Sequence, residues 1–174
     1  MMDFFDAVDK RRSMRGYEAR EVEQEKLDRI LNAINKAPSA GNMQSYEVVV
    51  VKDKKIREAL AQASRGQGFI ADAPVVLVFC TNPLKAGSKY ASRGVNLYSI
   101  QDATIAAAYS QLASTSLGLG TVWVGAFNPE QVAEAISAPE GITPVAIIPV
   151  GYTTENPSPT PRRSLDDLVK KEHF

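Results

Sequence analysis

The segment from Leu97 to Leu117 constrains the fold most, because it predicts a long helix built mainly from small residues. Ile105 and Tyr109 are the only large side chains between Gln101 and Gln111. Small side chains let other helices approach closely, so we expect this helix to be wrapped by neighbours rather than to lie on the surface. Two arrangements fit. It is either a central core helix of one chain, or a helix that also packs against the same region of a second subunit.

Hydrophobic spacing predicts further helices and strands around this segment. The expected helices are a short one ending near Lys10, then 23–36, 53–64 and 129–137, and a weak one at 165–171. Apolar runs predict buried strands at 46–51, 74–80, 121–127 and 144–150. No repeat or linker divides the chain. We therefore expect a single α+β domain over 1–174, with a central sheet flanked by helices.

Composition excludes several classes of protein. The chain has 174 residues, 44% of them apolar, which is enough for one sizeable core. Its 20 basic and 20 acidic residues create no overall field for nucleic acid or a membrane surface. No run approaches the about 20 apolar residues of a membrane span, and no signal-peptide core is present, so we expect a soluble cytoplasmic protein. The single cysteine, Cys80, ends an apolar run and is expected to be a buried, inert thiol.

The connection between the helix at 23–36 and the strand at 46–51 is unusually polar. It contains Pro38, Ser39, Ala40, Gly41, Asn42, Gln44 and Ser45. An ordinary turn needs only about two to six residues. Either these side chains satisfy the loop's own backbone, or the loop's amides and open backbone face a ligand.

Two basic clusters lie near opposite ends of the chain. Arg11, Arg12, Ser13 and Arg15 follow the first helix, and Arg162 and Arg163 follow a proline-rich stretch. Guanidinium groups offer planar forks of donors that suit a phosphate. Each cluster alone also fits a solvated basic surface, and composition does not show whether the two meet.

Several motifs of catalysis and phosphate binding are missing. The chain contains no Walker A pattern, no G-x-S-x-G turn and no Ser/His/Asp or Cys/His arrangement. The glycine-rich stretch at 118–125 precedes a strand, whereas a dinucleotide fingerprint follows one. If the protein is an enzyme, we expect no catalytic side chain of its own, and the reactive atoms belong to a cofactor.

A set of motifs, in order along nearly the whole chain, resembles the nitroreductase family of FMN-dependent oxidoreductases. The motifs are Arg11-Arg12-Ser13-Met14-Arg15, Ala37 to Gln44, Asp72-Ala73-Pro74, Gly118 to Phe127, Pro149 to Tyr152, and Pro161-Arg162-Arg163. The resemblance implies a nitroreductase-like fold with a mostly antiparallel sheet, a long central helix and FMN at the interface of a homodimer.

The resemblance also implies roles for particular residues. The FMN phosphate and ribityl chain would be held by Arg11, Arg12, Ser13 and Arg15, with Arg162 and Arg163 closing on the phosphate. The loop of the other subunit, with Pro38, Ser39, Ala40, Asn42 and Gln44, would cover the isoalloxazine ring. Gln67 would contact the pyrimidine side of the ring, and the backbone of Gly125 and Ala126 would pass flavin N5.

The chain departs from the family pattern in three places. Gln44 is followed by Ser45-Tyr46 where the family commonly has Pro-Trp, and Gly125 stands where some members have an acidic residue. The stretch 81–96 is short, whereas larger relatives carry an inserted helical segment at this point, over the substrate cleft. Tyr90 and Arg93 of this stretch either reach a substrate or belong to a plain surface loop, which is the reading we expect.

The leading hypothesis is a homodimer that passes hydride from NADH or NADPH through FMN to a nitroaromatic, a quinone or a similar acceptor in a ping-pong cycle. The alternative is a flavin-binding protein without nicotinamide-dependent turnover. A nucleic-acid binder using Arg11 to Arg15 is disfavoured by zero net charge.

Overall fold

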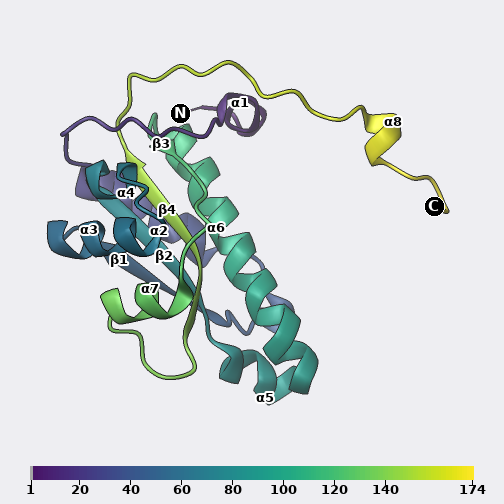
Figure 1. Cartoon of the computed structure of the whole chain (residues 1–174). Helices are drawn as coiled ribbons and strands as arrows, with labels where there is room; N and C mark the ends of the chain where they lie inside the picture. The colour runs from purple at the N-terminus through teal and green to yellow at the C-terminus, as the bar shows by residue number, and fades with distance from the viewer. Residues whose placement is uncertain (1) are drawn as a thin grey trace.

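Four strands form one antiparallel sheet in the computed structural model, which describes residues 2–174. The strand order is β1 (Tyr46–Val51), β2 (Val75–Thr81), β4 (Thr143–Gly151) and β3 (Gly120–Thr121), and every neighbouring pair is antiparallel. A register shift between Phe79 and Cys80 interrupts the pairing of β2 with β4. The α+β class and the antiparallel sheet predicted from the sequence are confirmed (Figure 1).

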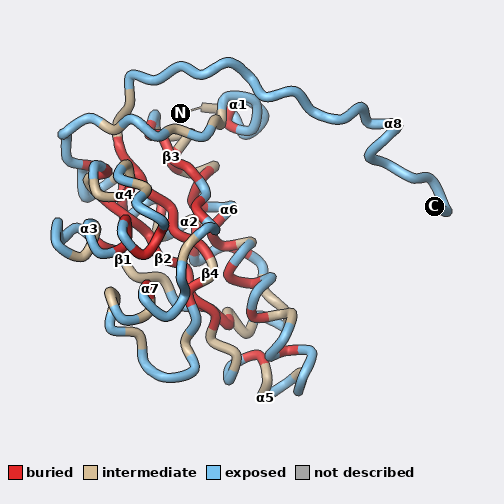
Figure 2. The backbone as a smooth tube through the Cα atoms, in the orientation of Figure 1, coloured by how far each residue is buried: buried red, intermediate tan, exposed pale blue. Residues whose placement is uncertain are grey.

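Helices cover both faces of the sheet, because side chains of the central strands alternate between two cores. Val75, Leu77 and Phe79 of β2 join one core cluster, together with buried residues of α2 (Gln24–Asn35) and α6 (Ser99–Ser116). Val76 and Val78 join the other, with residues of α3 (Lys54–Ala63), α4 (Phe69–Asp72) and α7 (Pro129–Ala135). Figure 2 shows the buried strands between the exposed outer surfaces of the helices.

The long helix α6 is a core helix, as one of the two sequence readings predicted. Ala103, Ala106 and Ala107 are fully buried against the sheet and α2. Ile100 and Tyr109 lie on a face that stays exposed. Gly118 follows the helix with a φ of 75°, the left-handed conformation expected of a glycine at a helix C-terminus.

The two ends of the chain lie on the same side of the sheet. Helix α1 (Phe4–Lys10) packs against the C-terminal part of α6. The C-terminal segment leaves β4, crosses above α1 and reaches away from the body of the protein to α8 (Leu165–Leu168), as Figure 1 shows. No helix within residues 2–174 is long and apolar enough to cross a membrane.

Three expectations about secondary structure were wrong. The strand expected at 121–127 is reduced to β3 and one bridge between Val124 and Ile147. In this register Val122 lies opposite Pro149, which has no backbone N–H to donate to the ladder. Residues 81–96, expected as a surface loop, form α5 (Pro83–Arg93) and a π-helical turn, η2 (Gly94–Tyr98). The helix expected at 165–171 is shorter, since α8 ends at Leu168.

Candidate functional site

The N-terminal arginine segment lies along the edge of the sheet. Ser13 pairs with Thr121 of β3, and Met14 N–H donates to Thr121 O at 3.0 Å. Gly120 allows this close approach, since a Cβ there would lie 2.9 Å from Met14 Cγ. The segment is thus a short addition to the sheet that brings residues 11–15 to the end of β3.

One arginine of the C-terminal cluster, Arg162, lies near enough to Arg11 for the two positive charges to interact. The pKa of the Arg11 guanidinium is lowered, first by burial and then by the positive charges of Arg162 and Arg12. Arg12 turns back onto α1, where its Nη1 donates to the carbonyls of Asp9 and Arg11. Arg163 points toward α8, with its Nε 3.8 Å from Asp167 Oδ2. Arg11 and Arg162 therefore form a pair of like charges that an anion would stabilise, as a phosphate site requires.

A hollow lies between the arginine segment and the C-terminal segment. Its volume is about 410 Å³, and it is lined by Ser13, Arg15, Glu155, Asn156 and Pro157. Glu155 Oε2 accepts from Arg15 N–H at 2.7 Å, so the C-terminal segment is fastened to the arginine segment here. The Arg15 guanidinium lies 5.9 Å from the centre of the Phe69 ring, which links the hollow to the start of α4.

Gln67 and Ala126, which the resemblance implied as two separate flavin contacts, lie next to each other. The Gln67 amide donates to Ala126 O at 3.3 Å and to Ser64 O at 2.9 Å. A Cβ at Gly68 would meet no atom within 4 Å, so the backbone beside Gln67 borders open space. Gln67, the 125–126 backbone and the arginine segment, which Arg15 links to this region through Phe69, are thus the candidates for one half of a site.

The loop at 38–44 lies elsewhere in the chain. Ala40 N–H donates to Asp102 Oδ1 in the first turn of α6, whereas the arginine segment lies beyond the last turn. Helix α6 has 18 residues and is therefore about 27 Å long, so the loop and the arginines of one chain do not share a ligand. The expectation that a second subunit supplies the loop agrees with this separation and stays a prediction.

Only one of the two loop amides is free. Gln44 Nε2 donates to Asn35 Oδ1 at 3.2 Å, and Ser39 Oγ accepts from Gln44 N–H at 3.0 Å. Asn42 is exposed, and its side chain makes no hydrogen bond within residues 2–174. Helix α5 lies on the loop, because a Cβ at Gly41 would run into Tyr90 Oη and Lys89 Nζ.

Sequence reasoning missed three residues of this arrangement. Phe69, under Arg15, follows Gln67 by two positions and is the only one of the three with a local signal. Glu155 and Asp102 reach their partners through long-range contacts that no spacing reveals.

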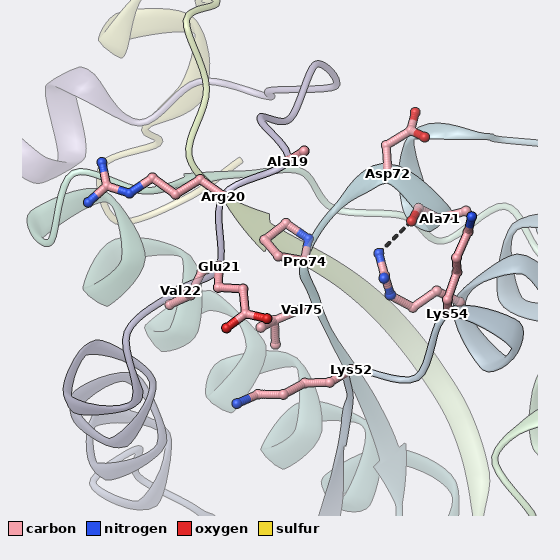
Figure 3. A pocket seen from close by; sticks show the side chains of 11 residues that line it. Ala19, Arg20, Glu21, Val22, Lys52, Lys54, Ala71, Asp72, Pro74 and Val75 are labelled. Atoms are coloured by element: carbon pink, nitrogen blue, oxygen red, sulfur yellow. Dashed lines mark hydrogen bonds between the residues drawn. The ribbon is translucent and has the colours of Figure 1, made fainter.

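Another hollow of about 410 Å³ lies between the 19–22 segment and α3, and none of the expected site residues lines it (Figure 3). Its charges have both signs, from Arg20, Glu21, Lys52, Lys54, Arg57 and Asp72. The guanidinium of Arg57 already donates to the carbonyls of Ala71 and Ala73. This hollow is therefore a poorer phosphate site than the Arg11 and Arg162 pair.

Comparison with known proteins shows which family the chain resembles. The model of the nitroreductase family matches residues 8–70 and 64–152, which include the arginine segment, the loop, Gln67 and Ala126 but not Arg162. A protein of Methanothermobacter thermautotrophicus, named as an NADH dehydrogenase/NAD(P)H nitroreductase, is 34% identical over 160 residues, covering 90% of this chain and 80% of its own. The FMN reductase [NAD(P)H] of Bacillus subtilis is 31% identical over 178 residues, covering 94% and 71%.

Solved structures agree. A nitroreductase family protein from Clostridium difficile 630 superposes with a TM-score of 0.88 at 31% identity, covering 99% of this chain and 100% of its own. Sequence motifs, fold and family model lead to the same conclusion: the chain belongs to the nitroreductase family.

Proposed function

We propose that the protein is a homodimeric FMN-dependent oxidoreductase that takes electrons from NADH or NADPH and passes them to a small acceptor, such as a nitroaromatic or a quinone. The observation that carries the proposal is the hydrogen bond between Gln67 and Ala126, which Arg15 of the arginine segment approaches through Phe69. The Bacillus subtilis relative is named for FMN and NAD(P)H, which is the same pair of ligands.

The residues of this half-site fit FMN in charge and in shape. Arg11, Arg162 and Arg15 would hold the phosphate, with Ser13 and Arg12 beside it. Gln67 would offer an amide to the polar edge of the ring, and its bond to Ala126 O keeps the amide next to the 125–126 backbone. Gly125 leaves room at this point, since a Cβ there would meet only Trp123, with Nε1 at 3.4 Å.

Bound FMN would supply the exchange of hydride between reduced nicotinamide and acceptor. The protein's part is to orient and to polarise. The backbone of Gly125 and Ala126 would lie against the ring, and the arginines would provide positive charge that stabilises a negatively charged ligand. No side-chain acid or nucleophile is needed for this task.

The dimer completes the site. One chain places the loop at 38–44 far from its own arginines, so the loop of a second copy would cover the ring, with Pro38, Ser39 and Ala40 against it and Asn42 and Gln44 near its edge. Apolar surface for such contact is present: Ile100 and Tyr109 of α6, and Leu165 and Leu168 of the extended tail, are exposed. An obligate interface of this kind buries about 2,000 Å² or more.

The whole chain, 1–174, would then act as one FMN-binding domain, and a cytoplasmic location stays a prediction. The acceptor would stack in the slot that the nicotinamide leaves. Since the slot selects flat rings rather than one polar group, a range of acceptors is expected.

Anaerobic absorbance spectroscopy of the purified protein tests the proposal. With FMN bound, the visible flavin band should bleach on addition of NADH or NADPH and return when a quinone is added. A flavin band that neither nicotinamide bleaches would support the alternative, a flavin-binding protein without nicotinamide turnover. A protein that binds no FMN would refute both.

A further inference from the structure

Asp102 is a buried carboxylate in the first turn of α6 whose hydrogen bonds reach the loop. Its side chain belongs to a residue only 1% exposed. Oδ1 accepts from Ala40 N–H at 2.9 Å, and Oδ2 accepts from Ser45 N–H at 3.3 Å and from the Ser45 hydroxyl at 2.5 Å. One carboxylate thus holds both ends of the segment between residues 40 and 45.

The backbone between these two anchors has an unusual conformation. Gly41, Asn42 and Gln44 have φ values of 54°, 58° and 47°, in the left-handed region. Non-glycine residues adopt this region only when surrounding structure compensates the strain. The anchors at Ala40 and Ser45 enclose all three residues, so Asp102 is well placed to keep the loop in this shape.

The chemistry of the contact requires a carboxylate. Three donors converge on two oxygens, and an asparagine at this position would offer a single acceptor oxygen and bring two further donors. The negative charge of Asp102 also contributes to the raised pKa of the Tyr46 hydroxyl, although burial is the larger cause.

Ser45 makes this pair a particular feature of the chain. It stands where the family commonly has proline, which offers neither an N–H nor a hydroxyl. Both of the donors that Ser45 supplies go to Asp102. Serine at this position therefore replaces the stiffness of a proline with two hydrogen bonds.

We propose that Asp102 is a positioning residue for the flavin: through Ala40 and Ser45 it fixes the loop that presents Asn42 to the FMN of the opposite subunit. The inference rests on the proposed function. It assigns to a residue outside the ligand site the task of shaping the cover of that site.

Two hydroxyl deletions on the FMN-loaded protein test this. Ser45→Ala removes the hydroxyl that donates a hydrogen bond to Asp102 Oδ2. Ser110→Ala is the matched control: Ser110 is also fully buried, its hydroxyl donates to Ala107 O at 2.7 Å, and it lies about two helical turns beyond Asp102 in α6. The measurements are the FMN dissociation constant, the visible circular dichroism of bound flavin and the unfolding midpoint of the apo-protein.

We expect Ser45→Ala to raise the FMN dissociation constant about three- to tenfold, less than the direct loss of a hydrogen bond between FMN and a charged group, because Ser45 acts on FMN only through the loop. We also expect it to alter the flavin circular dichroism. Ser110→Ala should change neither, even if it lowers the unfolding midpoint. Equal flavin effects in both variants, or an unchanged flavin in Ser45→Ala, would overturn the inference.

Asp102→Asn adds a second test that uses the same measurements. Its effect on the FMN dissociation constant should exceed that of Ser45→Ala, and adding Ser45→Ala to it should cost little more, because both changes break the same contact. If Asp102→Asn does not fold, the comparison of Ser45→Ala with Ser110→Ala still tests the inference. A wild-type protein that binds no FMN would overturn the proposed function and this inference together, whereas FMN binding insensitive to Ser45→Ala would overturn the inference alone.

Discussion

Replacing Arg11 by glutamine should weaken FMN binding without lowering the stability of the apo-protein. Arg11 is partly buried, and its pKa is lowered by burial and by the charges of Arg162 and Arg12. Without a bound anion, the positive charge is therefore unfavourable where it lies. Removing it relieves repulsion in the apo-protein and removes attraction in the complex, so the two states should respond in opposite directions.

The magnitude follows from the interaction that is lost. A hydrogen bond to a charged group contributes about 1.5–3 kcal/mol, which corresponds to an increase in the FMN dissociation constant of about 10- to 150-fold. The unfolding midpoint of apo Arg11→Gln should equal or exceed that of the wild type. Because the contact is partly exposed, added salt should weaken FMN binding more in the wild type than in the variant.

Quenching of FMN fluorescence on binding gives the dissociation constants, and thermal unfolding of the apo-proteins gives the midpoints. Lys54→Gln is a suitable control, since it removes one exposed positive charge, 3.8 Å from Glu58, that is not part of the arginine segment. An unchanged FMN dissociation constant in Arg11→Gln, or an equal increase in Lys54→Gln, would refute the assignment of Arg11 to the phosphate. A lower apo midpoint would refute the repulsion argument.

Three further predictions concern the rest of the chain. The pKa of Glu23 is lowered to about 2, chiefly by the hydrogen bond from the Tyr152 hydroxyl, and NMR titration should show it rising toward the ordinary carboxyl value in Tyr152→Phe. The stabilisation that this bond contributes is present above about pH 4.3 and is lost as the pH falls toward 2. An unchanged Glu23 pKa in the variant would disprove the coupling. The Cys80 thiol, whose pKa burial raises to about 12, should resist a thiol reagent at about pH 8 until the protein is unfolded, and rapid labelling of the native protein would contradict its burial. Leu60→Ala should lower the free energy of unfolding by about 2–5 kcal/mol in urea titration, since Leu60 is fully buried, and a loss below about 1 kcal/mol would show that the core below α3 relaxes around it.

Local sequence signals predicted most helices, and the one large omission has a physical explanation. Asn128-Pro129 predicted the start of α7, and Asn82-Pro83 caps α5 in the same way. The second signal went unused because α5 buries only Ala86, so no apolar periodicity supported it. The prediction of a longer third strand was wrong for the opposite reason. Val122 and Val124 show the alternating burial of a strand, but the backbone between them pairs only in part.

The ligand site was predicted as a list of residues, without their arrangement. Spacing identified the arginines and the polar loop as unusual, and the family resemblance added Gln67 and gave them a common ligand. Neither could show that the positive charge of Arg162 acts on Arg11, or that the Gln44 amide donates a hydrogen bond to Asn35. Such contacts depend on the path of the C-terminal segment and on the loop conformation, which local patterns do not encode.

The sequence by itself determined the alternation of helices and strands, the small-residue core helix and the chemical character of the site, because hydrophobic periodicity and side-chain chemistry are local properties. Only the tertiary structure decided which of these residues meet. The sheet order brings the end of β4 and the segment around Ser13 to either side of β3, and α6 holds the loop at its other end. Asp102 shows the difference most clearly: in the sequence it is one acidic residue in a helix, and in the structure it joins two ends of a strained loop.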